Sequence, residues 1–177
     1  SGLPGELFAH APLPFHEALG RLFSVILRSG RVPSDWRRSV IIPIPKTAEF
    51  LGNLDQLRPI TLIEVGRKLF STITTRRLAD VIDSRPVLQS ANFGFSRGVS
   101  AHHAVHVFQL VAEDALRNRA DLEVVAVDIR RAYDSVPFAS LERALARIRV
   151  PPAYTAIILD LARDRSVQVL TAFGLTD

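Results

Sequence analysis

Apolar residues at helical spacing predict a series of helices along the chain. In "PFHEALGRLFSVILRSG" they recur every three or four positions, and Gly30 follows as a helix stop. The same spacing predicts a second long helix over residues 63 to 83 and a third over 100 to 118, with Ser100 as its N-cap. Shorter helices are predicted over residues 137 to 148 and 153 to 163.

Short apolar, β-branched runs predict strands. "SVIIPIPK" contains Pro43 and Pro45, which lack a backbone N–H, so this run fits an edge strand. Residues 122 to 128, "LEVVAVD", predict a buried strand, and residues 166 to 172 predict another whose edge lacks a partner and invites self-association. Helices and strands mix without regular alternation, which favours the α+β class.

Composition narrows the class of protein. The chain has 177 residues, enough for one domain or a piece of a larger one, and no apolar run long enough to span a bilayer. Its net charge of +4 is carried by arginine far more than lysine, which suits phosphate-rich partners or a generic basic surface. With no cysteine, disulfides and thiolate metal sites are excluded. Methionine is absent and the last apolar run has no closing element, so we expect a fragment.

An acid and an aromatic follow the run at 122 to 127. Asp128 at a strand end could bind a hard cation such as Mg²⁺, which prefers oxygen ligands, or could cap the turn that follows. Two-ion phosphoryl transfer would require further carboxylates. Tyr133 could form the floor of a nucleotide pocket or be an amphipathic core residue at a helix start. Asp134, with Ser135 and Pro137, is mainly a signal for a helix N-terminus.

Cations and aromatics elsewhere suggest binding to phosphates or nucleic acid. Lys46 and Arg58 lie on or beside a strand and could clamp a triphosphate, or could be solvated surface charges. "NFGFSRGVS" could lie against a nucleic-acid strand through stacking and backbone amides, or Phe93 and Phe95 could anchor the loop in a core. The histidines at 102, 103 and 106 lack a cysteine or a well-placed acid to complete a zinc site.

Four segments in a fixed order resemble the reverse transcriptase domain of non-LTR retrotransposons and their group II intron relatives. They are "GRVPSDWRRSVIIPIPK", "LRPITLIEVGRKLFSTITTRRL", "LQSANFGFSRGVSAHHAV" and "VAVDIRRAYDSV". The resemblance implies a right-hand polymerase fold, with helices packed on a small antiparallel sheet and the palm truncated at its C-terminal side. Residues 1 to 120 would then be a fingers-like region with an N-terminal helical segment, and residues 121 to 177 a partial palm.

The resemblance also implies residue roles. Asp128 matches the first aspartate of the palm metal motif, where the Ile129 carbonyl would help to hold the same ion. Tyr133 matches the aromatic beneath the incoming sugar, Arg58 the fingers arginine that contacts the triphosphate, and Lys46, more loosely, a fingers lysine. The complete domain would use two Mg²⁺ ions, with Mn²⁺ as a substitute. The segment that matches the family's template contact contains Phe93, Gly94, Phe95, Arg97 and Gly98.

The sequence lacks two motifs of the family that concern activity. The aromatic-Ala-Asp-Asp motif does not occur in these residues, nor does the glutamine- and glycine-containing motif that contacts the nucleotide. The resemblance as a whole implies that the parent is an RNA-directed DNA polymerase that uses an RNA template, a DNA primer and dNTPs. It would act in the nucleus if it belongs to a eukaryotic retroelement. The chain alone would be inactive.

Two other interpretations remain open. The chain could be a catalytically dead reverse-transcriptase-like module that binds nucleic acid or protein. It could also be a generic basic α+β scaffold, although this interpretation makes the four ordered motifs a coincidence.

Overall fold

The structure, a computed structural model, describes residues 5–48, 52–85, 87 and 91–176. The chain divides into two compact units, and each is described by itself. The first combines residues 1–72 with residues 138–177, and the second is residues 73–137. None of the described helices is long and apolar enough to cross a bilayer.

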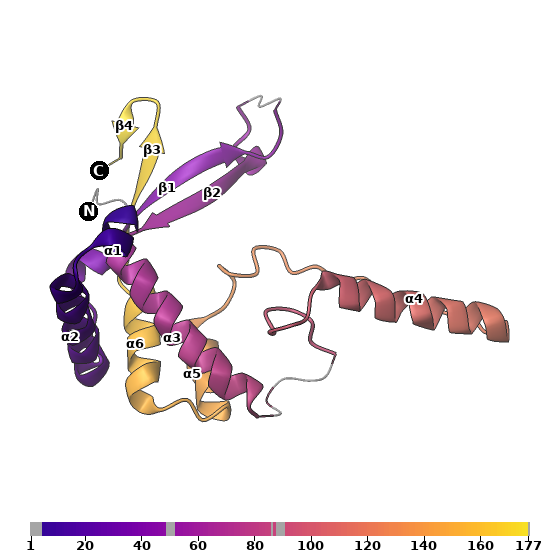
Figure 1. The fold of residues 1–177 in the computed structure, drawn as a ribbon. Helices are drawn as coiled ribbons and strands as arrows, with labels where there is room; N and C mark the ends of the chain where they lie inside the picture. The colour runs from indigo at the N-terminus through magenta and orange to yellow at the C-terminus, as the bar shows by residue number, and fades with distance from the viewer. Residues whose placement is uncertain (1–4, 49–51, 86, 88–90, 177) are drawn as a thin grey trace. The chain divides into compact units, whose positions relative to one another are not determined.

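The first unit contains a mixed four-stranded sheet with helices beside it (Figure 1). Its helices are close to those predicted. α2 ends at Ser29, and Gly30 follows as its C-cap with a left-handed φ of 68°. The elements of this unit are α1 (Gly5–His10), α2 (Leu13–Ser29), η1 (Ser34–Arg37), β1 (Arg38–Pro45), η2 (Leu54–Gln56), β2 (Leu57–Ile63), the first part of α3 (Val65–Asp83), α5 (Phe138–Arg147), α6 (Pro152–Ala162), β3 (Ser166–Thr171) and β4 (Gly174–Leu175).

The sheet is mixed, so the expectation of an antiparallel sheet is wrong for one pairing. The strand order is β2-β1-β3-β4. β1 pairs antiparallel with β2, and β3 pairs antiparallel with β4, but β1 and β3 are parallel. A long connection that includes helices brings β3 back to β1 in the same direction, as parallel pairs require.

β1 is an interior strand, and the prediction that it forms an edge is wrong. It lies between β2 and β3, but β3 pairs only with Arg38 to Ile41. Pro43 and Pro45 fall in the other half, where β2 is the only strand paired with β1 in the described sheet. The missing N–H groups are therefore tolerated because that half of the strand has one neighbour rather than two.

The strand predicted at residues 166 to 172 is confirmed as β3, but its far edge is not free. Leu170 and Thr171 pair with β4, and the Thr176 N–H donates to the Val169 carbonyl at 3.0 Å. Gly174, with φ 115°, allows the chain to reverse at this point. Nothing in the structure supports the expected self-association through this edge.

An aromatic cluster is at the centre of the first unit's core. Phe23 of α2, Trp36 of η1 and Phe70 of α3 have ring centroids 5.3 to 6.2 Å apart, the separation of favourable aromatic pairs. Phe70 is only 1% exposed. The other buried apolar side chains are Ile26, Val32, Leu145, Val150, Ile157 and Leu159.

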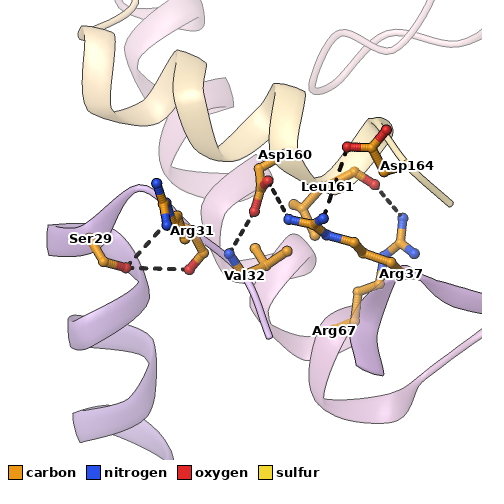
Figure 2. A network of polar contacts seen from close by, with 8 residues as sticks. All are labelled: Ser29, Arg31, Val32, Arg37, Arg67, Asp160, Leu161 and Asp164. Carbon is orange, nitrogen blue, oxygen red and sulfur yellow. Dashed lines mark hydrogen bonds and ion pairs between the residues drawn. The ribbon is translucent and has the colours of Figure 1, made fainter. Parts of the chain in front are cut away.

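Asp160 on α6 joins two segments that are distant in sequence (Figure 2). Its Oδ2 accepts a hydrogen bond from the Val32 N–H at 2.8 Å, and its Oδ1 accepts one from Arg37 Nη2 at 2.7 Å. Asp164, one turn further along the chain, lies 4.0 Å from Arg37 and is largely exposed. Asp160 therefore ties the segment between α2 and β1 to α6.

Arg67, in the first turns of α3, is a buried cation that the sequence interpretation did not single out (Figure 2). Arg67 is only 7% exposed. Its Nη1 donates to the Trp36 carbonyl at 2.6 Å, and its Nη2 donates to the Leu161 carbonyl at 3.0 Å. Burial, and then the nearby charge of Arg165, lowers the pKa of Arg67. An arginine nevertheless stays charged near neutral pH, so these two carbonyls solvate a buried charge.

The second unit contains the end of α3 and the long helix α4 (Ala101–Asn118), which confirms the third predicted helix. The Ser100 N–H donates to His103 Nδ1 at 3.0 Å, so that histidine supports the helix start. No described side chain of α4 is buried. The apolar side chains of Val105, Phe108, Val111 and Leu116 on this helix are therefore exposed.

Residues 122 to 128 do not form the predicted buried strand. They are irregular in the structure, and Val125 and Val127 are 85% and 84% exposed. A strand needs a neighbour to take up its backbone hydrogen bonds, and no segment within the described ranges pairs with this one. The apolar composition predicted a strand, but the pairing that would make one is not present.

Replacing Phe70 by alanine tests the aromatic cluster. We expect Phe70→Ala to lower the free energy of unfolding by about 3–5 kcal/mol, because it removes a large buried ring and leaves a cavity. Urea unfolding followed by the fluorescence of Trp36, the single tryptophan, measures this loss. Phe173→Ala is the control, since Phe173 is fully exposed and should change stability by less than about 0.5 kcal/mol. Equal losses in the two variants would contradict the assigned core.

Replacing Asp160 or Asp164 by asparagine tests the polar network, with Asp164 as the matched control. Asp160→Asn replaces an acceptor of two hydrogen bonds by a group with one carbonyl oxygen, so we expect a loss of about 1–3 kcal/mol. Asp164→Asn should cost less than about 0.5 kcal/mol, because that carboxylate is 83% exposed and 4.0 Å from its partner. The same urea titration compares them, and a larger effect at Asp164 would show that the network is wrongly assigned.

Candidate functional site

Asp128 lies on an exposed, irregular segment of the second unit, directly before a turn. Within the described part of the chain its carboxylate accepts no hydrogen bond, so the alternative that it caps this turn has no support. The turn is instead closed by the Arg131 carbonyl, which accepts from the N–H groups of Asp134 and Ser135, each at 3.0 Å. Ile129, whose carbonyl was expected to share an ion with Asp128, is exposed beside it.

Tyr133 is in the same turn and is 85% exposed, so it is not a core residue at a helix start. α5 begins at Phe138, just after Pro137, as the sequence predicted. The Ser135 hydroxyl donates to the Ala132 carbonyl at 3.0 Å and therefore belongs to the turn rather than to α5. The aromatic ring of Tyr133 and the carboxylate of Asp128 are both open to solvent, as a binding role requires.

Lys46 and Arg58 lie on one face of the β1–β2 hairpin in the first unit. Arg58 is opposite Ile44 in the register, and the Lys46 N–H donates to the Gln56 carbonyl at 2.8 Å. Lys46 is therefore diagonal to Arg58, and side chains at such positions are roughly 7–8 Å apart at their Cα atoms. Both residues are exposed. The hairpin thus presents two cations on the same side.

One donor of Lys46 is engaged within the hairpin. Its ammonium donates to the carbonyl of Asp55 in η2 at 2.6 Å. A lysine ammonium has three donors, so others stay available to a phosphate.

The segment from Phe93 to Gly98 forms a loop that lies against the C-terminal half of α3. Phe93 is half-buried, whereas Phe95 is 99% exposed and has a left-handed φ of 59°. The alternative of a two-ring core anchor therefore fails for Phe95. Arg97 Nη1 forms an ion pair with Asp80 Oδ1 on α3 at 2.9 Å.

Loop and helix enclose an open hollow of about 490 Å³. Residues of α3 and of the loop line this hollow together. Part of the predicted template-binding segment, Phe93 to Gly98, therefore lies next to α3. The lining residues are Thr75, Arg76, Ala79, Asp83, Phe95, Ser96 and Arg97.

The predicted site residues fall into two groups that belong to different units. Lys46 and Arg58 are in the first unit, and Asp128, Ile129, Tyr133 and the loop are in the second. Within the first group, the two cations share one face of the hairpin. Within the second group, Asp128 and Tyr133 share one exposed segment.

The described residues do not complete a metal site. No group of three or more histidine, cysteine or acidic side chains gathers among them in a way that could hold an ion. Asp128 offers one carboxylate, whereas a magnesium ion takes six oxygen ligands and usually keeps several waters. Asp128 could therefore supply one ligand to a magnesium ion, but the described residues do not supply a complete coordination sphere.

Asp80 is the site residue that sequence reasoning missed. It is 17 positions before Arg97, and no local pattern links an acid in the last turns of a helix to an arginine in a later loop. Only the folded arrangement of α3 and the loop reveals the pair.

Comparison with known proteins assigns the family. A model described as reverse transcriptase (RNA-dependent DNA polymerase) matches residues 44–175, which include every predicted site residue. The chain belongs to the reverse transcriptase family. Members of this family generally use divalent metal ions.

Several curated relatives come from non-LTR retrotransposons. The chain is 26% identical over 151 residues to a probable RNA-directed DNA polymerase from transposon BS of Drosophila melanogaster, covering 85% of this chain and 17% of that protein. It is 28% identical over 148 residues to a retrovirus-related Pol polyprotein from the type-1 retrotransposable element R2 of Popillia japonica, covering 84% and 20%. The chain thus spans a fifth or less of the length of these two relatives.

Proposed function

We propose that this chain is part of an RNA-directed DNA polymerase that extends a DNA primer on an RNA template with dNTPs. The observation that carries the proposal is the family match over residues 44–175, because it contains Lys46, Arg58, the loop at 93 to 98 and Asp128 in one ordered set. The names of the relatives, which include RNA-directed DNA polymerases of transposons, support the same activity.

The proposal assigns residues 1 to 120 to a fingers-like region and residues 121 to 177 to a partial palm. The β1–β2 hairpin, with its two exposed cations, suits the fingers role because an incoming triphosphate needs positive charge on an accessible face. The exposed apolar residues Val125 and Val127 suit a palm strand that is covered by neighbouring strands in the complete protein.

Around the nucleotide, Arg58 and Lys46 would bind the phosphates and Tyr133 would pack beneath the sugar. Arginine is suited to this role because its planar guanidinium binds phosphate oxygens in a bidentate way. Tyr133 is exposed on its turn, so its ring is accessible to a nucleotide. The loop from Phe93 to Gly98 would lie along the template, with the exposed ring of Phe95 available for stacking on a base.

Asp128, with the Ile129 carbonyl, would supply ligands to one of two Mg²⁺ ions, which Mn²⁺ could replace. Bound ions of this kind stabilise the charge that develops on the transferring phosphoryl group. Because no group of three or more histidine, cysteine or acidic side chains gathers among the described residues, the proposal gives Asp128 one ligand position only.

A second candidate function is a catalytically dead module that binds nucleic acid or protein. The observation that favours it is that no group of three or more histidine, cysteine or acidic side chains among the described residues could hold a metal ion. Such a module would keep the loop and the hairpin cations but would not extend a primer.

Primer extension on an RNA template with Mg²⁺ and dNTPs tests the proposal. We expect the parent polypeptide that contains this chain to make cDNA, and Asp128→Asn in it to lower the rate by more than about a hundredfold, because a metal ligand is worth several kcal/mol. Asp121→Asn, an acid in the same exposed segment, is the matched control and should keep its activity. The 177-residue chain by itself should make no product.

The outcomes separate the two candidate functions. Loss of cDNA in Asp128→Asn alone supports the polymerase and the metal role together. Equal activity in the two aspartate variants would exclude the metal role of Asp128. A parent polypeptide that binds the template but never extends the primer would favour the binding module.

Steady-state kinetics of the parent polypeptide test the role of Arg58. We expect Arg58→Ala to raise KM for dNTP by about ten- to a hundredfold, the cost of hydrogen bonds to a charged group. Arg38→Ala is the control, because Arg38 is an exposed arginine at the opposite end of the same hairpin. If both variants raise KM equally, the effect is general electrostatic attraction rather than a contact made by Arg58.

A further inference from the structure

The loop that contains Phe95 is tied to α3 by one ion pair between charged side chains. Arg97 Nη1 lies 2.9 Å from Asp80 Oδ1, and both side chains are more than half exposed. Asp83, one turn later on the same helix, lines the adjoining hollow but makes no ion pair within the described ranges. Two acids of α3 thus lie near the loop, and only one of them holds it.

The side chains of the loop differ in exposure, and the exposed Phe95 also borders the open hollow beside α3. Phe93 and Ser96 are partly buried, while Phe95 is fully open to solvent. This arrangement requires a left-handed backbone at Phe95, with φ 59°, which is uncommon for an aromatic residue. Gly94 N–H donates to Asn92 Oδ1 at 3.2 Å, which bends the chain just before it.

An uncommon backbone conformation persists only where neighbouring contacts fix it. Here the contact that follows Phe95 is the Arg97–Asp80 pair, two residues later. Without it, the loop could rotate about Phe95 and the ring would no longer be fixed outward.

We propose that Asp80 is a positioning residue, which acts through Arg97 to hold the loop on α3 and to keep the ring of Phe95 presented to a single-stranded RNA. This inference rests on the proposed nucleic-acid function of the loop. It also gives Arg97 a structural partner inside the protein.

The charge of Asp80 makes the inference testable. An acid close to a bound RNA repels its phosphates, so removing an acid should by itself favour RNA binding. If Asp80 positions the loop, its removal should instead weaken binding, opposite in sign to the effect of removing Asp83. A pair as exposed as this one shifts a local equilibrium by about two- to fivefold.

The first experiment measures the loop without any RNA. Trypsin cleaves after Arg97 only when that side chain leaves Asp80, so its rate of cleavage there reports the free fraction of Arg97. We expect Asp80→Asn to raise this rate by about two- to fivefold relative to cleavage after Arg119, and Asp83→Asn to leave it unchanged. Asp80→Glu keeps a carboxylate and should restore slow cleavage.

The second experiment measures the affinity of the 177-residue chain for a fluorescein-labelled single-stranded RNA by fluorescence anisotropy. We expect Phe95→Ala and Asp80→Asn each to weaken binding, the latter by about two- to fivefold. Asp83→Asn should bind as tightly as the unaltered chain or more tightly, and Asp80→Glu should bind normally. Unchanged urea midpoints for the aspartate variants would show that their effects are local.

The outcomes distinguish the inference from the function on which it rests. If Phe95→Ala weakens binding while Asp80→Asn and Asp83→Asn behave alike in both experiments, the positioning role is overturned and the loop remains an RNA-binding element. If Asp80→Asn speeds cleavage but neither it nor Phe95→Ala changes RNA affinity, the loop does not bind RNA and both proposals for it fall.

Discussion

The buried guanidinium of Arg67 is the constraint on which the first unit depends. A charge removed from water must have hydrogen-bond partners, and Arg67 finds them in the carbonyls of Trp36 and Leu161. These carbonyls belong to η1, before the sheet, and to α6, before β3. One side chain of α3 therefore fixes the two segments that lead into the parallel strands β1 and β3. Phe70, one turn later on the same helix, packs its ring against both Phe23 and Trp36, so the apolar and polar contacts reinforce each other.

The local pattern of the sequence predicted most of the elements but not their pairing. The helices at α2 and α4 followed from apolar spacing, Gly30 and Ser100, which are all local signals. The strand at β1 was predicted, but its interior position was not, because the parallel pairing with β3 joins residues more than a hundred positions apart. At residues 122 to 128 the apolar run predicted a strand, yet a strand exists only with a partner, and composition does not specify one.

In the candidate site, too, local sequence signals mark some residues, whereas others are marked only by contacts with distant segments. The roles proposed for Asp128, Tyr133, Lys46 and Arg58 come from ordered motifs in the sequence, and all four residues are exposed in the structure. Arg67 and Asp80 could not be predicted, since nothing near them in the sequence distinguishes them from other charged helix residues. Their importance comes from carbonyls and an arginine supplied by other segments. The residues proposed to meet substrates were therefore visible in the sequence, whereas those that hold the scaffold and the loop became visible only in the fold.

The first unit is discontinuous, and this has a consequence for how it assembles. Residues 73–137 lie between two parts of one folded unit. β1 can pair with β3 only when Arg38 meets Ser166, its register partner far along the chain. Closing so long a loop is entropically costly, but the cost grows only with the logarithm of loop length, about 0.6 kcal/mol for each doubling. The first unit can therefore complete its sheet only after β3 has been synthesised, and its stability depends little on the length of the segment from 73 to 137. Insertions and deletions within residues 73–137 can accumulate with little effect on the stability of the unit that encloses them.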